Sequence, residues 1–163
     1  MMCSDREFAS ALGIYELFIH VSYIRHPPEF VAKLFKGGCP AYLEHMEFLP
    51  IQACADVGTG PRNYNVDIFH PGRVATSADI LACMAERRVR PLMDQELISF
   101  LFCYGYIQLA FEFVALGSET MIGRNPFVIS AFTYDANEPC LQLVPASGPF
   151  GARCRFPVVP LDR

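Results

Sequence analysis

Residues 87–100 read RRVRPLMDQELISF, and this stretch decides how the two halves of the chain are joined. Pro91 has no N–H with which to continue a helix, and it biases Arg90 toward an extended backbone. We therefore predict a helix that ends near Arg88, an extended joint at Arg90, and a second helix that begins near Asp94. Because the arginines gather at this joint, the same stretch is also a candidate anion-binding site.

The helices on either side of this joint each carry their own sequence pattern. Thr76 followed by Asp79 places a hydroxyl cap before an acid in the first turn, which is typical of a helix start. The apolar residues at helical spacing are Ile80, Leu81, Met84 and Ala85 before the joint, and Leu97, Phe100, Leu101 and Tyr104 after it. Gly105 is predicted to end the second helix.

The apolar run at 97–116, LISFLFCYGYIQLAFEFVAL, has the length of a transmembrane helix. Gly105 interrupts it, and Gln108 and Glu112 lie in its second half. A carboxylate is costly inside a bilayer, and the apolar spacing changes from helical to alternating after the glycine. We interpret the run as a buried helix followed by a buried strand, with membrane association through 97–116 as the weaker alternative.

The N-terminal half contains alternating patterns that indicate strands. Residues 15–24 predict a half-buried strand, and residues 28–35 predict a short helix that begins with proline. Residues 47–55 and 64–70 are predicted to pair as a hairpin across a long glycine-containing loop. Residues 1–13 are predicted to be a weakly ordered lead-in.

The C-terminal half predicts further strands, separated by Gly, Pro, Asn and Asp turns. These strands are expected at 111–116, 127–134, 140–144 and 154–159. We therefore predict one α+β domain over residues 1–163, with a mostly antiparallel sheet, about three helices and a strand-rich C-terminal half.

The composition narrows the class of protein. The chain has 163 residues, of which 52% are hydrophobic and 18% charged, and its mean hydropathy is +0.25. These values fit a single domain with a substantial core and exclude a disordered chain. The formal net charge of -4 argues against general nucleic-acid binding, which usually needs a basic surface.

The number and spacing of the cysteines indicate a reducing compartment. Their number, 7, is odd, and no two of them have a C-x-x-C or other metal-ligand spacing. The N-terminus MMCSDREF also lacks the basic and apolar regions of a secretory signal. We therefore expect a cytoplasmic protein whose cysteines are small buried apolar residues.

Four short motifs after residue 89 resemble a group of small uncharacterised bacterial proteins. In that group an R-P-A-T-x-x-E-L-L-A-F helix start is followed by a V-A-L-G-S strand and a C-terminal R-F-x-x-V strand. The corresponding segments here are RPLM at 90–93, ELISF at 96–100, VALGS at 114–118 and RFPVV at 155–159. The likeness covers about 66–160, and it implies a fold plan without implying an activity.

One departure from that pattern concerns the helix start. The group has a capping threonine where this chain has Met93, so only the glutamate of the capping box, Glu96, is kept. Asp94 is expected to substitute from the first turn. The same order of motifs is also distantly similar to C-type-lectin-like and formylglycine-generating-enzyme-like domains, which is our alternative fold.

Arg88, Arg90 and Glu96 are the first candidate site. Together they would form an anion site at a helix N-terminus, where free N–H groups favour negative charge. The alternative is that Arg90 pairs with Glu96 or Asp94 and fixes the angle between two helices, which is the interpretation we favour.

The histidines and cysteines give little sign of a metal or catalytic site. His20 and His26 are candidates to approach each other, and Cys54 and His70 are candidates to face each other across the predicted hairpin. No spacing demands either arrangement, and no phosphate-binding loop is present. We therefore predict no metal and no cofactor.

The loops near the C-terminus are the second candidate site. They contain Asp135, Asn137 and Arg153, together with Phe150, which we expect to be an exposed aromatic contact. Plain turns are the alternative. The functional hypothesis is a non-catalytic binding or protein-interaction module that binds a protein partner or itself. The rival is an enzyme with a cleft near Arg90, Glu96 and the 135–153 loops.

Overall fold

The computed structural model describes residues 3–4, 17–21, 26–57, 60–104, 111–133 and 138–161. Over these residues the predicted α+β architecture and the strand-rich C-terminal half are confirmed. The helices are α2 (Pro28–Leu34), α3 (Pro40–Glu44), α4 (Ser77–Glu86), α5 (Asp94–Tyr104) and the short 3-10 helix η1 (Gln52–Cys54). The strands are β1 (Cys3–Ser4), β2 (Leu17–Val21), β3 (Leu49–Pro50), β4 (Arg62–His70), β5 (Val89–Pro91), β6 (Glu112–Ile122), β7 (Asn125–Thr133), β8 (Pro139–Pro145) and β9 (Cys154–Pro160).

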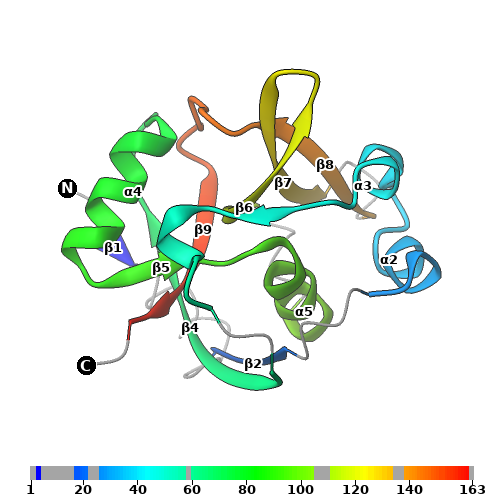
Figure 1. Ribbon diagram of the computed structural model, residues 1–163, viewed down its shortest axis with the longest axis horizontal. Helices are drawn as coiled ribbons and strands as arrows, with labels where there is room; N and C mark the ends of the chain where they lie inside the picture. Colours follow the sequence, from blue (N-terminus) through cyan, green and yellow to red (C-terminus); the bar gives the residue numbers. More distant parts are fainter. Residues whose placement is uncertain are drawn as a thin grey trace.

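The strands form one bent sheet in the order β1-β4-β9-β6-β7-β8. Every pair is antiparallel except β6 with β9. Strand β4 pairs with β2 along its first half and with β1 and β9 along its second, so the sheet changes direction there (Figure 1). Strand β9 contacts β4, β5 and β6, which makes it the centre of the fold.

The joint at 87–100 has the predicted form. Helix α4 ends at Glu86, and β5 then runs extended through Arg90 beside β9. Helix α5 begins at Asp94 and is buried from Asp94 to Leu101. Within the apolar run at 97–116, residues 97–104 belong to α5 and residues 112–116 to β6, in line with a helix followed by a strand. Residues 105–110, which include the predicted helix end at Gly105, lie outside the described residues. In the described part of the chain, no helix is both long enough and apolar enough to pass through a bilayer.

Two apolar clusters fill the space around the sheet. The larger one joins β2, α2, α3 and α5 to one part of the sheet, and the smaller one joins α4 to the part around β9. Figure 1 shows α4 on one side of β9 and α2, α3 and α5 on the other. Of the sequence-predicted core residues, Ile80 and Met84 of α4 and Leu97, Phe100 and Leu101 of α5 are buried. Leu81 and Tyr104 are only partly buried, and Ala85 is exposed, so its prediction as a core residue is wrong.

The predicted hairpin of 47–55 with 64–70 is wrong. Only Leu49 and Pro50 form a strand there, and they pair with β6. Residues 52–54 turn into the 3-10 helix η1, and the chain then enters β4, whose first half pairs with β2. Within the mainly apolar stretch at 47–55, a two-residue strand at the edge of the sheet is therefore followed by a turn. The Ile51 N–H at the start of this turn donates to the Gly117 carbonyl of β6.

The edges of the sheet are covered at specific points. The Tyr104 hydroxyl accepts from the Phe18 N–H at 2.9 Å and donates to the Phe18 carbonyl at 3.1 Å, so α5 covers the outer edge of β2. On β8, the Gly37 N–H donates to Pro139 O and the Leu141 N–H donates to Gly38 O, both at 2.9 Å. Covered edges of this kind limit pairing with other chains.

The lead-in lies mostly outside the described residues. Its described part, Cys3–Ser4, is strand β1 and pairs with His70 and Phe69 of β4. The weak order of residues 1–13 stays a prediction. Helix α3 was not predicted and brings the α-helices of the described residues to four.

Candidate functional site

Arg90 and Glu96 form a two-point ion pair inside the core. Arg90 Nη1 and Nη2 donate to Glu96 Oε2 and Oε1 at 2.9 and 2.8 Å. Arg90 is 4% exposed and Glu96 is 0% exposed. The pair spans the joint, because Arg90 lies on β5 and Glu96 in the first turn of α5. The guanidinium thus points onto Glu96, which is the bracing arrangement that we favoured from the sequence.

Arg90 makes two further contacts inside the core. Nη1 also donates to Pro91 O at 3.1 Å, and the guanidinium carbon lies 5.0 Å from the centroid of the Tyr64 ring. Burial alone would lower the pKa of Arg90, but its hydrogen bonds to Glu96 and the charge of Glu96 outweigh burial and raise it. Burial also raises the pKa of the neighbouring Cys54 thiol to about 11, so this cysteine is a poor nucleophile at neutral pH.

The start of α5 keeps half of the capping box and gains a substitute for the other half. Glu96 Oε2 accepts from the Met93 N–H at 2.8 Å, as the glutamate of such a box does. The Asp94 N–H is bound at 2.8 Å by the Ser118 hydroxyl of β6. Ser118 therefore accepts from this N–H at the start of the helix, and the expectation that Asp94 would replace the missing cap is corrected.

Asp94 instead lies at the centre of a second buried polar cluster. Its carboxylate accepts from Ser118 Oγ at 2.9 Å, from Tyr42 OH at 3.2 Å and from Gln95 Nε2 at 3.1 Å. Gln95 Nε2 also donates to Tyr42 OH at 3.0 Å. These donors come from α3, α5 and β6, so one carboxylate holds three elements together. Buried polar groups that are paired in this way make a fold specific.

The cluster reaches toward solvent at His26. The His26 N–H donates to Gln95 Oε1 at 3.0 Å, and its ring Nε2 lies 3.2 Å from Ser99 Oγ. The Ser99 hydroxyl donates to the Gln95 carbonyl at 3.0 Å, within its own helix. The His26 ring stacks on Phe30 at 5.1 Å, and Phe30 contacts Phe102 at 5.4 Å. Residues 26–30 are thereby fixed against α5.

We expect part of the stability of this contact to depend on pH through His26. Burial lowers the pKa of His26 below its ordinary value of 6.5, and the Gln95 hydrogen bond and the Asp94 charge oppose this only in part. The unfolded chain then binds the proton more readily than the folded chain. Stability from this group is therefore complete above pH 6.5 and falls as the pH drops below it.

Urea unfolding of the wild type and His26→Gln at pH 7.5 and pH 5.5 measures this contribution. The stability advantage of the wild type over the variant should shrink at the lower pH. Because the glutamine amide can still bond to Ser99, the comparison isolates the titration of the ring. An equal advantage at both pH values would contradict the assignment.

The other predicted site residues are placed as follows. Arg88 is exposed at the end of α4 with φ 56°, a left-handed conformation that glycine usually takes at this position. Arg153 is exposed in the turn before β9. Asp135 and Asn137 lie outside the described residues. The structure thus brings Arg90 and Glu96 together, and it leaves the role of the other loop residues as a prediction.

The expectation that Phe150 is an exposed contact is wrong. Its side chain is 5% exposed and meets the Phe156 ring edge-on at 5.4 Å. Its backbone pairs with Ala75, because Phe150 N donates to Ala75 O at 2.8 Å and Ala75 N donates to Phe150 O at 3.1 Å. The flanking glycines suggested an open loop, but the aromatic ring folds inward and anchors that loop on the smaller core cluster.

The histidines and cysteines do not form the arrangements considered from the sequence. His20 Nδ1 pairs with Asn63 Oδ1 at 2.7 Å, while His26 bonds to α5. Cys54 Sγ donates to Pro91 O at 3.5 Å, and the hairpin that would have brought it to His70 is not formed. Within the described ranges, no three His, Cys, Asp or Glu side chains are grouped so that they could hold a metal ion.

A further polar cluster lies where β6 and β9 run parallel. The fully buried Ser130 hydroxyl donates to Glu112 Oε1, and burial together with the charge of Glu112 raises the pKa of Cys154 to about 11. Arg155 lies 4.0 Å over the Phe111 ring and donates to Ala152 O at 2.8 Å. The alternation at 111–116 marked Glu112 as a polar residue on a buried strand, but nothing local indicated Ser130 as its partner.

The two polar clusters at the joint, around Glu96 and around Asp94, hold buried charges in place, because each carboxylate accepts several hydrogen bonds from groups of this chain. Sequence reasoning found Arg90 and Glu96 through their spacing. It missed Tyr42, Gln95 and Ser118 as members of a cluster, because their partners are distant in the sequence. Searches against protein-family models, curated protein sequences and solved structures find no match to this chain.

Proposed function

We propose that this chain is a non-catalytic interaction module that associates through exposed apolar side chains. The observation that carries the proposal is the contrast between its interior and its surface. The buried charges at the joint are bonded to groups of the same chain, as the Arg90–Glu96 pair shows. The described surface meanwhile exposes large apolar residues: Phe18, Leu49, Val74, Phe102, Met121 and Leu161.

The rival proposal of an enzyme needs Arg90 or Glu96 to be directed at a ligand. Their mutual hydrogen bonds direct each of them at the other, and both are buried. This geometry favours the interaction module. The exposed apolar side chains are less engaged with the interior: Leu49 is 71% exposed, and Phe102, although it contacts Phe30, is still 63% exposed. Clusters of exposed apolar side chains are common at sites of protein contact.

A cytoplasmic setting is part of the same proposal. The cysteines Cys39, Cys54, Cys83, Cys103, Cys140 and Cys154 carry free thiols. Burial raises the pKa of four of them, Cys39, Cys54, Cys140 and Cys154. Thiols with a raised pKa are weakly reactive, which suits small buried apolar residues in a reducing compartment.

Light scattering behind size-exclusion chromatography, over a series of concentrations, tests the proposal. We expect the mean mass to rise with concentration, or a bound protein to be recovered when the tagged full chain is used as bait. A chain that stays monomeric throughout, and that also captures no partner, would contradict the proposed function. An activity carried by the isolated chain and abolished by a single polar substitution would favour the enzyme instead.

A further inference from the structure

The β6–β7 hairpin and strand β3 present an apolar surface that no other described element covers. Leu49 pairs with Glu119, and Met121 pairs with Pro126. Paired residues share a face of a sheet, and residues two apart on one strand do so as well. These four residues therefore form one surface, which we term the hairpin face. Leu49 is 71% and Met121 is 54% exposed.

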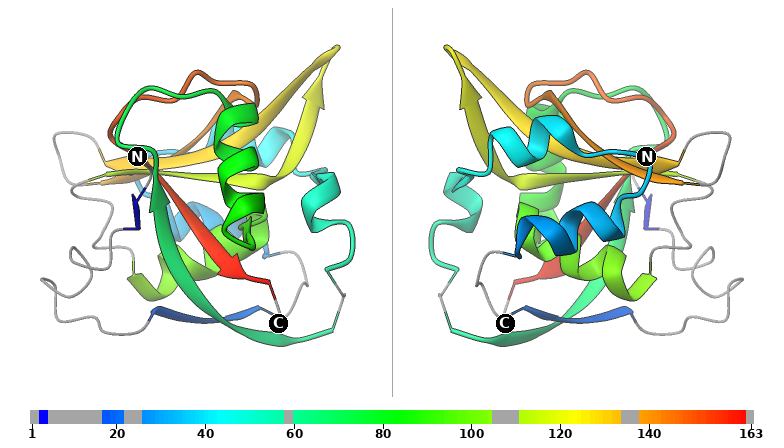
Figure 2. Two further views of the ribbon diagram at one scale, coloured as in Figure 1. Left: turned by 90° about the vertical axis from the view of Figure 1, so that its left-hand side faces the viewer. Right: turned by 90° about the vertical axis from the view of Figure 1, so that its right-hand side faces the viewer.

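The hairpin projects from the body, so the hairpin face is accessible to another molecule. Figure 2 shows the tip of the β6–β7 hairpin extending past the helices. At the tip, Gly123 has φ 63°, and Arg124 is exposed beside it. The opposite face is closed, because Ser118 and Thr120 are 2% and 4% exposed. Of the two sides of this hairpin, the hairpin face is therefore the one that another molecule can reach.

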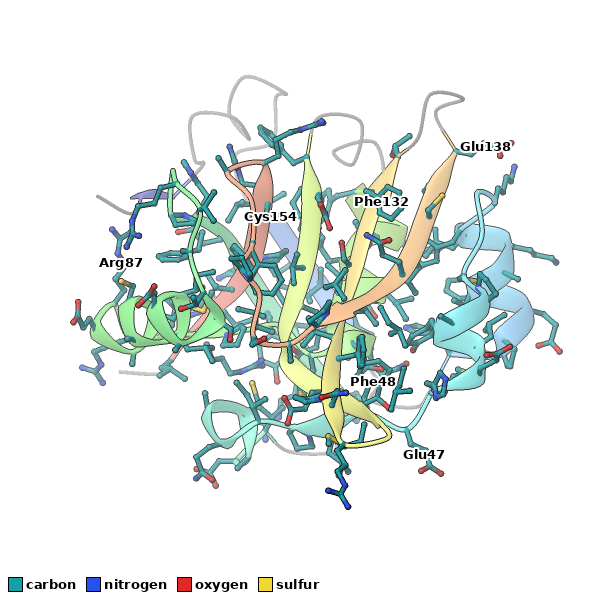
Figure 3. The ribbon with its side chains drawn as sticks, turned by 90° about the horizontal axis from the view of Figure 1, so that it is seen from above. Glu47, Phe48, Arg87, Phe132, Glu138 and Cys154 are labelled. Carbon is teal, nitrogen blue, oxygen red and sulfur yellow. The ribbon has the colours of Figure 1, made fainter. Side chains whose placement is uncertain are left out.

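Charges of both signs lie on the hairpin face or beside it. Glu47 and Glu119 lie where the hairpin joins the body, and Arg124 lies at its tip. Figure 3 shows the Glu47 side chain pointing outward from the segment that joins α3 to β3. Within the described residues, none of these three side chains has an ion-pair partner. One small surface therefore carries an apolar centre, with negative charge at one end and positive charge at the other.

We infer that the hairpin face is the surface through which two copies of this chain pair, an inference that rests on the proposed function. Relative to Met121, Glu119 is two residues toward the body and Arg124 is three residues toward the tip. On β6 the first spacing is about 7 Å. Arg124 lies in the turn just beyond the Ile122–Asn125 pair, so it is at most about two strand steps, or about 7 Å, past Met121. If two hairpins meet face to face and antiparallel, the two Met121 side chains touch, and Arg124 of each copy comes opposite Glu119 of the other.

A two-fold contact of this kind is self-complementary. The same surface serves both copies, and each charge pair occurs twice around the apolar centre. A partner of one charge sign would match only one end of the hairpin face, which is why a second copy fits better. The face is small beside the roughly 800 Å² that each partner buries in a standard interface. We therefore expect a rapidly exchanging dimer with a Kd on the order of 10 to 100 µM.

Charge exchange in the full chain tests the pairing by sedimentation velocity, at concentrations below and above the expected Kd. Arg124→Glu places two acids opposite each other, and Glu119→Arg places two arginines opposite each other. Each variant alone should dimerise at least tenfold more weakly than the wild type. When the two variants are mixed, both charge pairs form across the heterodimer, and association should return to near the wild-type strength.

Met121→Asp and Val74→Asp separate the hairpin face from general surface effects. Both residues are exposed and apolar, but Val74 precedes α4 and is outside the hairpin face. Met121→Asp should abolish the dimer, and Val74→Asp should leave its Kd unchanged, with thermal unfolding confirming that both variants fold.

Two outcomes would overturn this inference. If the wild type associates and the charge and Met121 variants associate equally well, the copies pair elsewhere and the proposed function survives. If the wild type stays monomeric at every concentration, the hairpin face is not a self-association surface. The proposed function is then also lost only if the bait experiment recovers no partner.

Discussion

Glu96→Ala is expected to lower the free energy of unfolding by about 3–5 kcal/mol, because it leaves the buried Arg90 guanidinium without its counter-charge. The same change removes the acceptor for the Met93 N–H at the start of α5. Urea unfolding followed by circular dichroism measures the loss. Should the alanine variant fail to fold, Glu96→Gln keeps an oxygen near Met93 and should show a smaller loss of the same sign.

The double variant Arg90→Met with Glu96→Leu is the matched control. Replacement of a buried ion pair by apolar side chains of similar size is often neutral or stabilising. We therefore expect the double variant to be clearly more stable than Glu96→Ala alone, even though it carries more substitutions. A Glu96→Ala variant within about 1 kcal/mol of the wild type would mean that water reaches Arg90 and that the pair is not a buried brace.

Gly117→Ala is expected to destabilise the fold by about 3 kcal/mol or more, because an added methyl group would collide with backbone atoms. A Cβ at Gly117 would lie 2.6 Å from Leu92 O and 2.9 Å from Met93 N. Gly117 cannot move away easily, since its N–H donates to Leu92 O at 2.8 Å and its carbonyl accepts from Ile51 N at 3.0 Å. Thermal and urea unfolding measure the effect.

Gly151→Ala is the comparison for this substitution. Nothing lies within 4 Å of a Cβ at Gly151, so its replacement should change stability by less than about 0.5 kcal/mol. Amide hydrogen exchange adds a local readout, because crowding at Met93 should speed exchange in the first turn of α5. Equal stability of the two alanine variants would show that β6 can shift away from the joint without cost.

Local sequence signals predicted the parts of the fold that local physics determines. Pro91 ended one helix pattern, and Thr76 capped α4 by accepting from the Asp79 N–H at 3.3 Å. The change from helical to alternating spacing within 97–116 marked the passage from α5 to β6. In each case the deciding contacts lie within a few residues of one another, so the pattern carries the information.

Features that depend on distant contacts were missed or wrongly predicted. The stretch at 47–55 is mainly apolar like a strand, but β6 accepts only Leu49 and Pro50. Asp94 looked like a helix cap until Ser118, 24 residues away, took that position. Phe150 looked exposed between glycines, and only the distant Phe156 and Ala75 explain its burial. The spacing of residues along a short segment does not determine which distant residue each of these side chains contacts.

The short motifs of the C-terminal half meet in space. The segment after Arg90 lies between β9 and β6: Leu92 N donates to Pro157 O, and Gly117 N donates to Leu92 O. Arg90 pairs with Val159 in the sheet. One contact region is thus formed by Arg90–Leu92, Gly117 and strand β9. We therefore expect a change in one of these segments to affect the packing of the others.

The Tyr104 bonds to Phe18 have a consequence for how β2 is held. One hydroxyl meets both the N–H and the carbonyl of a single residue, and only a residue whose two polar groups face away from β4 offers both. If β2 slid by one position, its two faces would be exchanged, so that Phe18 would turn inward and Leu17 and Ile19 outward. Because Tyr104 bonds only to backbone groups, it secures the free edge of β2, while the burial of Leu17 and Ile19 selects the alignment.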